Sequence, residues 1–256
     1  MQTLIVFTTK QDASRELLFT PKIQAVFAVQ IFFYEHFLHG EALPLFHSEA
    51  LVYLRDPFTS DIPDTELRPL ITKIFAHFRK NSFIDHLATL EDVYLEDKWL
   101  QYEQFKAFMP PTSLASATDT STSSPIIYKK RISSRSRHIQ FVPPVENKED
   151  YIAQVQLPIK EEYRVVEVQK EILPIMLIKS HKTTSSKVHV IAKTAITPEI
   201  QALVRDIQSK HSFDLVGYDI ALTEEDSLFL IEVNRSPQIL AYQREAGLNI
   251  FEKLLT

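Results

Sequence analysis

The chain contains no cysteine, so its 256 residues hold no disulfide, no thiolate metal site and no cysteine nucleophile. Glycine is almost as scarce, and Gly40, Gly217 and Gly247 are the complete set. Phosphate-binding loops of the Walker and dinucleotide types need several glycines at fixed spacing. The sequence therefore excludes both of these loop types.

Long apolar segments and a strong net charge are also missing. The most apolar stretch, Ile23–Leu38, is interrupted by polar residues such as Gln30 and Glu35, and a membrane-spanning helix needs about 20 mostly apolar residues. Residues 1–9 lack the pattern of a secretory signal. We therefore predict a cytoplasmic protein with no membrane partner. The formal net charge of −5 gives no general attraction to nucleic acid, so we do not expect nucleic acid as a partner.

The first 80 residues alternate between strand-like and helix-like patterns. Residues 3–8 and 50–54 are predicted to be buried strands. A long helix is predicted from Thr20, a good N-cap before a proline, to Gly40, which suits a left-handed C-cap. A second helix is predicted over residues 64–80. This alternation predicts an α/β unit with parallel strand pairing.

The middle of the chain is predicted to be richer in strands. A helix over residues 97–109 has Asp97 as its N-cap, and the Ser/Thr-rich residues 112–124 indicate a flexible connection. Another helix begins after Thr197. Strand-like segments lie at 125–130, 138–143, 151–157 and 163–168.

Residues 213–237 carry the most informative pattern, because two apolar runs flank a polar tetrapeptide. With Glu224–Ser227 as a four-residue hairpin loop, Thr223 pairs with Leu228 and Asp219 lies opposite Glu232. Side chains alternate between the two faces of a strand. One face then holds the apolar residues Tyr218, Ile220, Leu222, Phe229, Ile231 and Val233, and the other holds Asp219, Glu232 and Asn234.

Two opposed carboxylates destabilise a sheet unless something neutralises them. Three oxygen donors at one strand end are what Mg²⁺ takes, so we predict a metal site at Asp219, Glu232 and Asn234. The alternative is a solvated hairpin with its polar residues outward, but Leu228 and Leu230 make that face partly apolar. The metal hypothesis requires the three side chains to point to one side, with no salt bridge filling the place of the ion.

These residues resemble the ATP-grasp enzymes, with a pattern closest to bacterial glutathione synthetase and the RimK-type glutamate ligases. The family signature is an Asp on one strand and Glu-x-Asn-x-Ser-Pro on the next, found here at Asp219 and at Glu232–Pro237. The resemblance covers roughly residues 50–250 and implies the ATP-grasp fold, of mixed α+β and α/β class. It implies a small N-terminal α/β domain over 1–95, and two α+β subdomains that clasp nucleotide, over 96–155 with the phosphate loop and 156–256 with the Mg²⁺ site.

The resemblance also implies roles for individual residues. It places the backbone of Gln154, Val155, Gln156 and Leu157 at the adenine and Glu162 at the ribose. It implies catalytic roles for Lys129, Arg164 and Arg235, with Arg55 facing the substrate side. The residues that it places at the phosphates are Lys98, Lys129, Ser133, Ser134 and Arg135.

The activity that the resemblance implies is ligation of a carboxylate to an amine or thiol through an acyl phosphate. ATP and one or two Mg²⁺ ions, replaceable by Mn²⁺, would be the cofactors. A small-molecule or peptide carboxylate would be the substrate. The protein could act as a monomer or as a homo-oligomer. The alternative is a catalytically degraded nucleotide- or peptide-binding protein, because residues 133–138 contain no glycine. A third hypothesis is a nucleic-acid-associated protein that uses the basic run Lys129–Arg137.

Overall fold

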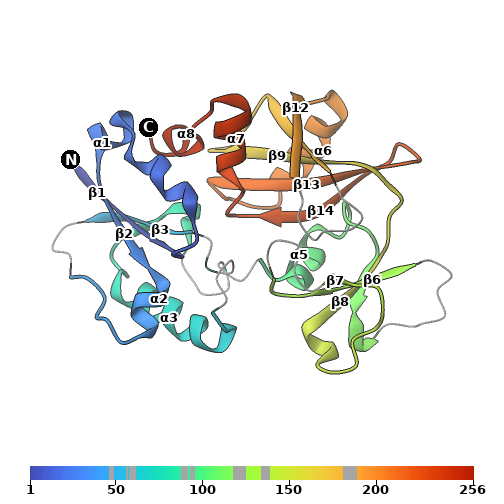
Figure 1. Cartoon of the computed structure of the whole chain (residues 1–256), viewed down its shortest axis with the longest axis horizontal. Coiled ribbons are helices and arrows are strands. Elements are labelled where there is room, and N and C mark those ends of the chain that lie inside the picture. Colours follow the sequence, from blue (N-terminus) through green and yellow to red (C-terminus); the bar gives the residue numbers. More distant parts are fainter. Residues whose placement is uncertain are drawn as a thin grey trace.

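The computed structural model describes residues 1–45, 49–55, 57, 62–87, 92, 96–117, 125–133, 139–180 and 189–256. The strands of these residues form three sheets that follow one another along the chain (Figure 1). Each sheet lies within one of the three predicted segments, although the domain boundaries themselves stay a prediction. Among the described residues, no helix is long and apolar enough to cross a membrane.

The N-terminal sheet is parallel, as the sequence predicts, and has helices on both faces. Its strand order is β2 (Phe27–Phe33), β1 (Gln2–Thr8), β3 (Ala50–Leu54) and β4 (Ser82–Phe83). Helix α3 (Asp64–His77) packs on the face that carries Ile5 and Phe7. Because side chains alternate along a strand, Leu4 and Val6 face the opposite side, towards α1 (Pro21–Val26) and α8 (Ile250–Leu255).

The predicted helix from Thr20 to Gly40 is wrong. Helix α1 spans only Pro21–Val26, strand β2 follows at once, and α2 covers Tyr34–Leu38. The sequence of β2, FAVQIFF, is rich in β-branched and aromatic residues, which favour strands. Seven residue pairs join β2 to β1, so tertiary pairing overrides the helical spacing of the apolar residues.

The central sheet is antiparallel, with the order β5 (Thr112–Leu114), β8 (Tyr151–Val155), β6 (Ile126–Lys130) and β7 (Ile139–Gln140). Helix α5 (Lys98–Phe105) precedes it, and Asp97 caps this helix by accepting a hydrogen bond from the Trp99 N–H. The predicted helix and its cap are therefore confirmed, with an earlier end at Phe105.

The C-terminal sheet has the order β12 (His189–Ala195), β11 (Ile175–Ser180), β9 (Ile159–Val168), β13 (Leu215–Thr223) and β14 (Leu228–Asn234), with β10 (Glu171–Ile172) beside β9. Helix α6 (Pro198–Gln208), capped by Thr197 as predicted, packs on one face. Helix α7 (Ile239–Ala246) packs on the other face beside α8. In Figure 1 this sheet lies above the central sheet, and α5 lies between them.

One hydrophobic cluster joins the N-terminal and C-terminal sheets. It contains Leu4 and Tyr53 from the first sheet, Val166 and Leu215 from the last, and Phe251 from α8, all of them fully buried. Burying such side chains contributes about 1.5–3 kcal/mol each, so the two sheets form a shared core. The central sheet adds no residue to this cluster among the described part of the chain.

Candidate active site

The predicted hairpin forms, and Asp219 lies opposite Glu232 as expected. The route to that pairing differs, because Leu222 rather than Thr223 pairs with Leu228. The loop is thus one residue longer than predicted, and a bulge between the Ile220–Leu230 and Asp219–Glu232 pairs restores the register. The predicted apolar face is therefore partly wrong, because Leu230 rather than Ile231 is buried in the core.

A row of charged side chains crosses the C-terminal sheet at this position. Arg164 on β9 is the register partner of Asp219 on β13, which is in turn the partner of Glu232 on β14. Lys179 on β11 is the partner of Glu162 on β9, two residues from Arg164. Because register partners point to the same face, these five side chains gather on one side of the sheet.

Asp219 is held by two cations. Its Oδ1 accepts from Arg164 Nε at 2.7 Å, and its Oδ2 accepts from Arg164 Nη2 at 2.7 Å and from Lys179 Nζ at 2.8 Å. Burial raises the pKa of Asp219, but the charges of Arg164 and Lys179 outweigh burial and hold it well below its usual range. The requirement that no salt bridge fills the place of the ion is therefore not met.

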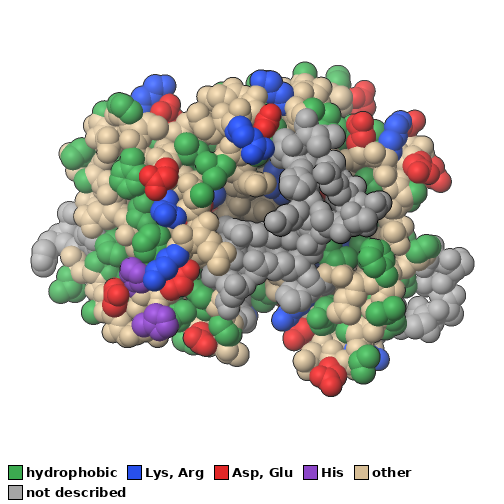
Figure 2. Space-filling model, in the orientation of Figure 1, with side chains coloured by type: hydrophobic (Ala, Val, Ile, Leu, Met, Phe, Trp, Pro, Cys, Tyr) green, Lys and Arg blue, Asp and Glu red, His purple; other side chains and the backbone are tan. Residues whose placement is uncertain are grey.

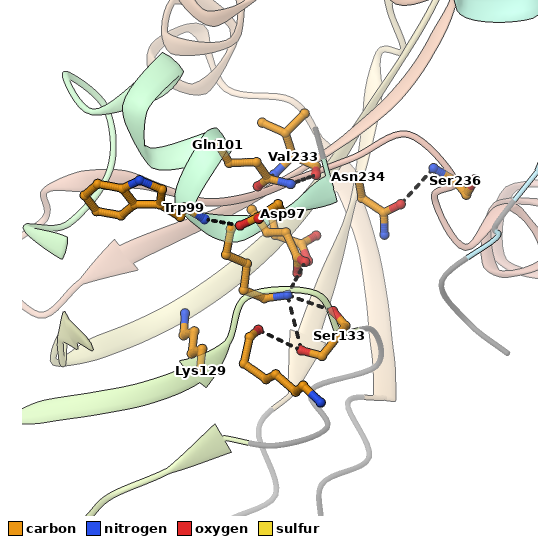
Figure 3. Close-up of polar contacts among 12 residues, drawn as sticks. Asp97, Trp99, Gln101, Lys129, Ser133, Val233, Asn234 and Ser236 are labelled. Carbon is orange, nitrogen blue, oxygen red and sulfur yellow. Dashed lines mark hydrogen bonds and ion pairs between the residues drawn. The ribbon is translucent and has the colours of Figure 1, made fainter. Parts of the chain in front are cut away.

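Glu232 and Lys98 connect this row to α5 and to the start of the predicted phosphate loop. Lys98 Nζ lies 3.4 Å from Glu232 Oε1 and donates to the Ser133 carbonyl oxygen at 2.7 Å. Figure 3 shows Ser133 on the loop below α5, close to this amine. The structure thus brings the predicted residues Lys98, Ser133 and Glu232 together, although they are far apart in the sequence.

Lys129 is a buried cation of the central sheet. Its Nζ donates to Gln154 Oε1 at 2.6 Å, and Gln154 in turn donates to Thr112 Oγ1. Burial, together with the charges of Lys98 and Lys179, lowers the pKa of Lys129 to about 8, against the opposing effect of Glu232. Lys129 and Gln154, both predicted to bind nucleotide, therefore lie in one hydrogen-bonded unit.

Two backbone groups of the predicted adenine segment are already used within the chain. The Val155 N–H donates to the Pro111 carbonyl at 3.0 Å, and the Gln156 N–H donates to the Pro125 carbonyl at 2.8 Å. That the backbone of residues 154–157 holds the adenine stays a prediction, and Leu157 is half-buried beside these two groups. The predicted residues Ser134 and Arg135 lie outside the described residues.

The segment after β14 turns sharply away from the charged row. Asn234 Oδ1 accepts from the Ser236 N–H at 2.8 Å, and Figure 3 shows the Asn234 side chain directed towards Ser236. Arg235, a predicted catalytic residue, is buried and binds Asp85 of the N-terminal unit. The structure therefore places Arg235 at the junction between the units and not beside Asp219.

Arg55, predicted to face the substrate side, is also at that junction. It is buried, binds Asp12 Oδ2 at 2.9 Å, and its Nη2 lies 3.4 Å from the Pro237 carbonyl oxygen. Gly217, the register partner of Asn234, lies just above this turn, and a Cβ there would come within 2.7 Å of Pro237 Cβ. The scarce glycine thus permits the close approach of β13 to the Ser-Pro turn.

Two site residues were not predicted from the sequence. Lys179 follows the apolar residues of β11, and only the pairing of β11 with β9 shows that it reaches Glu162 and Asp219. Gln101 is buried on α5 and forms two hydrogen bonds with the Val233 backbone, as Figure 3 shows. A polar residue at a buried helix position was the one sequence feature that could have indicated Gln101.

The surface away from this site offers no competing centre within the described residues. Histidine side chains gather on one face of the N-terminal unit (Figure 2), but no described group of His, Asp or Glu has the arrangement of a metal site. In the basic run, Lys129 is buried and Arg131 binds Asp97 with two hydrogen bonds. On the face in Figure 2, basic and acidic side chains are interspersed, so the nucleic-acid hypothesis gains no support.

Comparison with known proteins agrees with this geometry. Residues 129–256, half of the chain, match the RimK-like ATP-grasp domain. No curated protein matches the sequence. Among solved structures, the ATP-grasp ligase PsnB complexed with a minimal precursor has a TM-score of 0.71, 12% identity, and coverage of 100% of this chain and 98% of that chain.

Two further structures are similar. The macrocyclase MdnC of Microcystis aeruginosa MRC, bound with the precursor peptide MdnA, has a TM-score of 0.70 and 13% identity, with 100% and 98% coverage. N5-carboxyaminoimidazole synthetase of Staphylococcus aureus has a TM-score of 0.67 and 13% identity, with 99% of this chain and 76% of that chain covered. These likenesses show that the whole chain has the ATP-grasp fold.

Proposed function

Because the chain belongs to the RimK-like ATP-grasp family, we propose that its charged row is the centre of an ATP- and Mg²⁺-dependent ligase that joins a carboxylate to an amine. The observation that carries this proposal is the excess of positive charge around Asp219. Four cations meet three carboxylates there, namely Lys98, Lys129, Arg164 and Lys179 with Glu162, Asp219 and Glu232. A phosphate chain supplies the negative charge that this cluster lacks.

The oxygen donors fit Mg²⁺ by their chemistry. Asp219 and Glu232 are register partners on adjacent strands, and Asn234 follows on the same strand. For Asp219 to bind the ion, Arg164 and Lys179 must exchange its carboxylate for phosphate oxygens, and Asn234 must share its Oδ1 with the Ser236 N–H. When bound, Mg²⁺ would neutralise the phosphate oxygens and hold them in place.

The residues of the chain would act by position and charge. Lys98 and Lys129 approach from α5 and the central sheet, while Arg164 and Lys179 approach from the C-terminal sheet. Cations on both sides can stabilise the terminal phosphoryl group of ATP as it passes to an oxygen of the substrate carboxylate and ADP leaves with the electrons of the broken P–O bond. The amine then attacks the acyl carbon, phosphate leaves with the electrons of the broken C–O bond, and the nitrogen loses its proton to give the amide.

The substrate side of the proposal is a peptide or amino-acid carboxylate. PsnB and MdnC are both described in complexes with precursor peptides, and they share the fold of this chain over its full length. We keep the cytoplasm as the proposed location. A homo-oligomer also stays a proposal, and sedimentation of the purified chain measures it directly.

The experiment that tests the ligase function has two steps. Thermal unfolding with ADP and ATP, with and without Mg²⁺, should show a rise in Tm that requires both nucleotide and metal. ADP release is then measured over a panel of amino acids and acidic peptides, with and without an added amine. Turnover that requires both a carboxylate and an amine supports ligation.

The second candidate is a nucleotide-binding protein without chemistry. It is favoured by one observation, because both oxygens of Asp219 are held by Arg164 and Lys179 and the row is largely neutralised without an ion. That candidate predicts a nucleotide-dependent rise in Tm with no ADP release from any member of the panel. The absence of any nucleotide effect on Tm would contradict both candidates.

A further inference from the structure

Strand β14 is an edge strand of the C-terminal sheet, and helix α5 lies along its outer edge. Gln101 Nε2 donates to the Val233 carbonyl oxygen at 2.7 Å, and Gln101 Oε1 accepts from the Val233 N–H at 2.9 Å. The side-chain amide thus replaces a neighbouring strand at this residue. Three residues earlier, the Leu230 N–H donates to the Phe108 carbonyl at 2.8 Å. Both outward backbone groups of Val233 and the N–H of Leu230 therefore have partners outside the sheet.

The two contacts stand on either side of the bulge in β14. Leu222 pairs with Leu228 and Ile220 with Leu230, whereas Asp219 pairs with Glu232. If the register of the Leu222–Leu228 and Ile220–Leu230 pairs continued without a bulge, Glu232 would lie opposite Tyr218. The Tyr218 side chain points into the apolar core beside α6. A shift of one residue exchanges the two faces of a strand. The bulge therefore decides that Glu232 joins Asp219 on the charged face.

From these contacts we infer that Gln101 is a positioning residue for the metal site, because it holds the bulged strand at the residue between Glu232 and Asn234. This inference rests on the proposed function. Gln101 is 1% exposed, so water does not replace its amide when an apolar side chain of the same size fills its place. Loss of the amide would leave the N–H and C=O of Val233 buried without partners, and the strand would relax away from the register that gathers the three oxygen donors.

Helix α5 also links this strand to the phosphate side of the site. At its first turn, Lys98 Nζ lies 3.4 Å from Glu232 Oε1. The Lys98 N–H donates to the Arg131 carbonyl, and the Arg131 side chain binds Asp97. One short helix therefore sets the distance between Glu232 and the start of the predicted phosphate loop. Gln101 is the point at which that helix is fixed to β14.

The test compares two glutamines of the same helix. Gln101→Met has nearly the same size and removes both hydrogen bonds to Val233. The control is Gln104→Met, because exposed Gln104 donates a hydrogen bond of 2.6 Å to the Lys210 carbonyl, away from β14. Mn²⁺ binding to the full chain is followed by electron paramagnetic resonance with saturating ADP, well below the Tm of each variant. Hydrogen exchange of the β14 peptide is measured in parallel.

We expect Gln101→Met to weaken Mn²⁺ binding about tenfold or more, the usual effect of losing a residue that orients a ligand, and to speed exchange in β14. ADP binding without metal should be unchanged, and Gln104→Met should lower Tm slightly without moving Mn²⁺ affinity. Gln101→Glu keeps the acceptor for the Val233 N–H and loses the donor, so its Mn²⁺ affinity should be intermediate. Gln101→Glu decides the test if Gln101→Met does not fold.

The outcomes separate the two levels of the proposal. Wild-type Mn²⁺ affinity in Gln101→Met or Gln101→Glu, whatever their Tm, would overturn the positioning role and leave the ligase proposal standing. A wild-type chain that binds no Mn²⁺ in the presence of ADP would overturn the proposed metal site, and this inference with it.

Discussion

Two buried aspartates each bind an arginine, and their surroundings differ. Asp219 contacts Arg164 at 2.7 Å and Lys179 at 2.8 Å. Asp85 contacts Arg235 at 3.2 Å and otherwise accepts hydrogen bonds from the backbone N–H groups of Asp214 and Leu215. Burial raises the pKa of Asp85 and is only partly offset by Arg235, whereas the cations around Asp219 outweigh burial and lower its pKa.

This difference distinguishes the proposed binding site at Asp219 from the structural junction at Asp85. Around Asp219, side chains from several strands and from a second sheet supply more positive than negative charge, and side-chain partners can be exchanged for those of a ligand. At Asp85, one arginine and two backbone groups satisfy the carboxylate across the junction between the N-terminal and C-terminal sheets. We therefore expect changes at Asp219 to act on chemistry and changes at Asp85 to act on stability.

The largest expected effect is on turnover at the charged row. Asp219→Asn should lower ATP turnover by about 10³-fold or more, because the phosphates and metal lose a carboxylate at the reacting centre. Circular dichroism should show the native fold, with a reduced Tm because the half-buried cations Arg164 and Lys179 lose their partner. The matched control is Asp226→Asn at the exposed tip of the same hairpin, which should keep full turnover. Unchanged turnover in Asp219→Asn would remove it from the metal site.

The next effect is on stability at the junction. Asp85 has a φ of +66°, which Asn tolerates well, so Asp85→Asn isolates the loss of charge. It should lower the free energy of unfolding by about 3 kcal/mol, because Arg235 stays buried without a counter-charge. Urea unfolding measures this loss, and Asp85→Asn combined with Arg235→Met should recover part of it. Full stability with lost turnover would instead place Arg235 in the chemistry, as the sequence predicted.

The third effect is the pH dependence of nucleotide binding. Lys129 has a pKa of about 8, lowered by burial, and a neutral amine gives no charge to phosphate. ADP affinity, measured by calorimetry, should therefore fall by up to about tenfold per pH unit above that value. Lys129→Met should flatten the profile, while exposed Lys160→Met should not. A wild-type profile that is flat up to pH 10 would contradict the role of Lys129.

The lowered pKa of Lys129 also determines how the free energy of unfolding depends on pH. The folded pKa of Lys129 is about 8 and the unfolded value is 10.5, so the unfolded chain binds more protons between these values. The contribution of Lys129 to the free energy of unfolding therefore rises with pH across this window. As the pH rises from 8 to 10.5, deprotonation of Lys129 should therefore lower the affinity for ADP and raise the stability of the nucleotide-free protein.

The smallest effect concerns the Ser-Pro turn, which lies between the proposed active site and the junction of the two sheets. Gly217→Ala places a Cβ 2.7 Å from Pro237 Cβ, so the Ser-Pro turn must shift, and we expect a loss of about 1–3 kcal/mol in unfolding free energy. The control is Gly247→Ala, which meets no atom within 4 Å but has a φ of +69° and should cost about 1 kcal/mol. Thermal melts that rank the two in reverse would show that the turn adapts.

Much of the site was predictable because strand alternation is local. The hairpin, the opposition of Asp219 to Glu232 and the common face of Glu162 and Arg164 follow from spacing alone. The bulge was not predictable, and the opposed pair was correct because a loop predicted one residue too short compensated for it. The error is visible at Leu230, which is in the core although the spacing placed it outside.

The family signature, the capped helices at Asp97 and Thr197, and strands β1 and β13 follow from the sequence alone, because caps, turns and periodicity act over a few residues. The completed fold was needed to show that residues 27–33 form a strand, that Lys179 reaches Asp219, and that Arg235 binds Asp85. Each of these depends on a partner far away in sequence, and a buried charge or an edge strand takes whichever partner the completed fold brings to it.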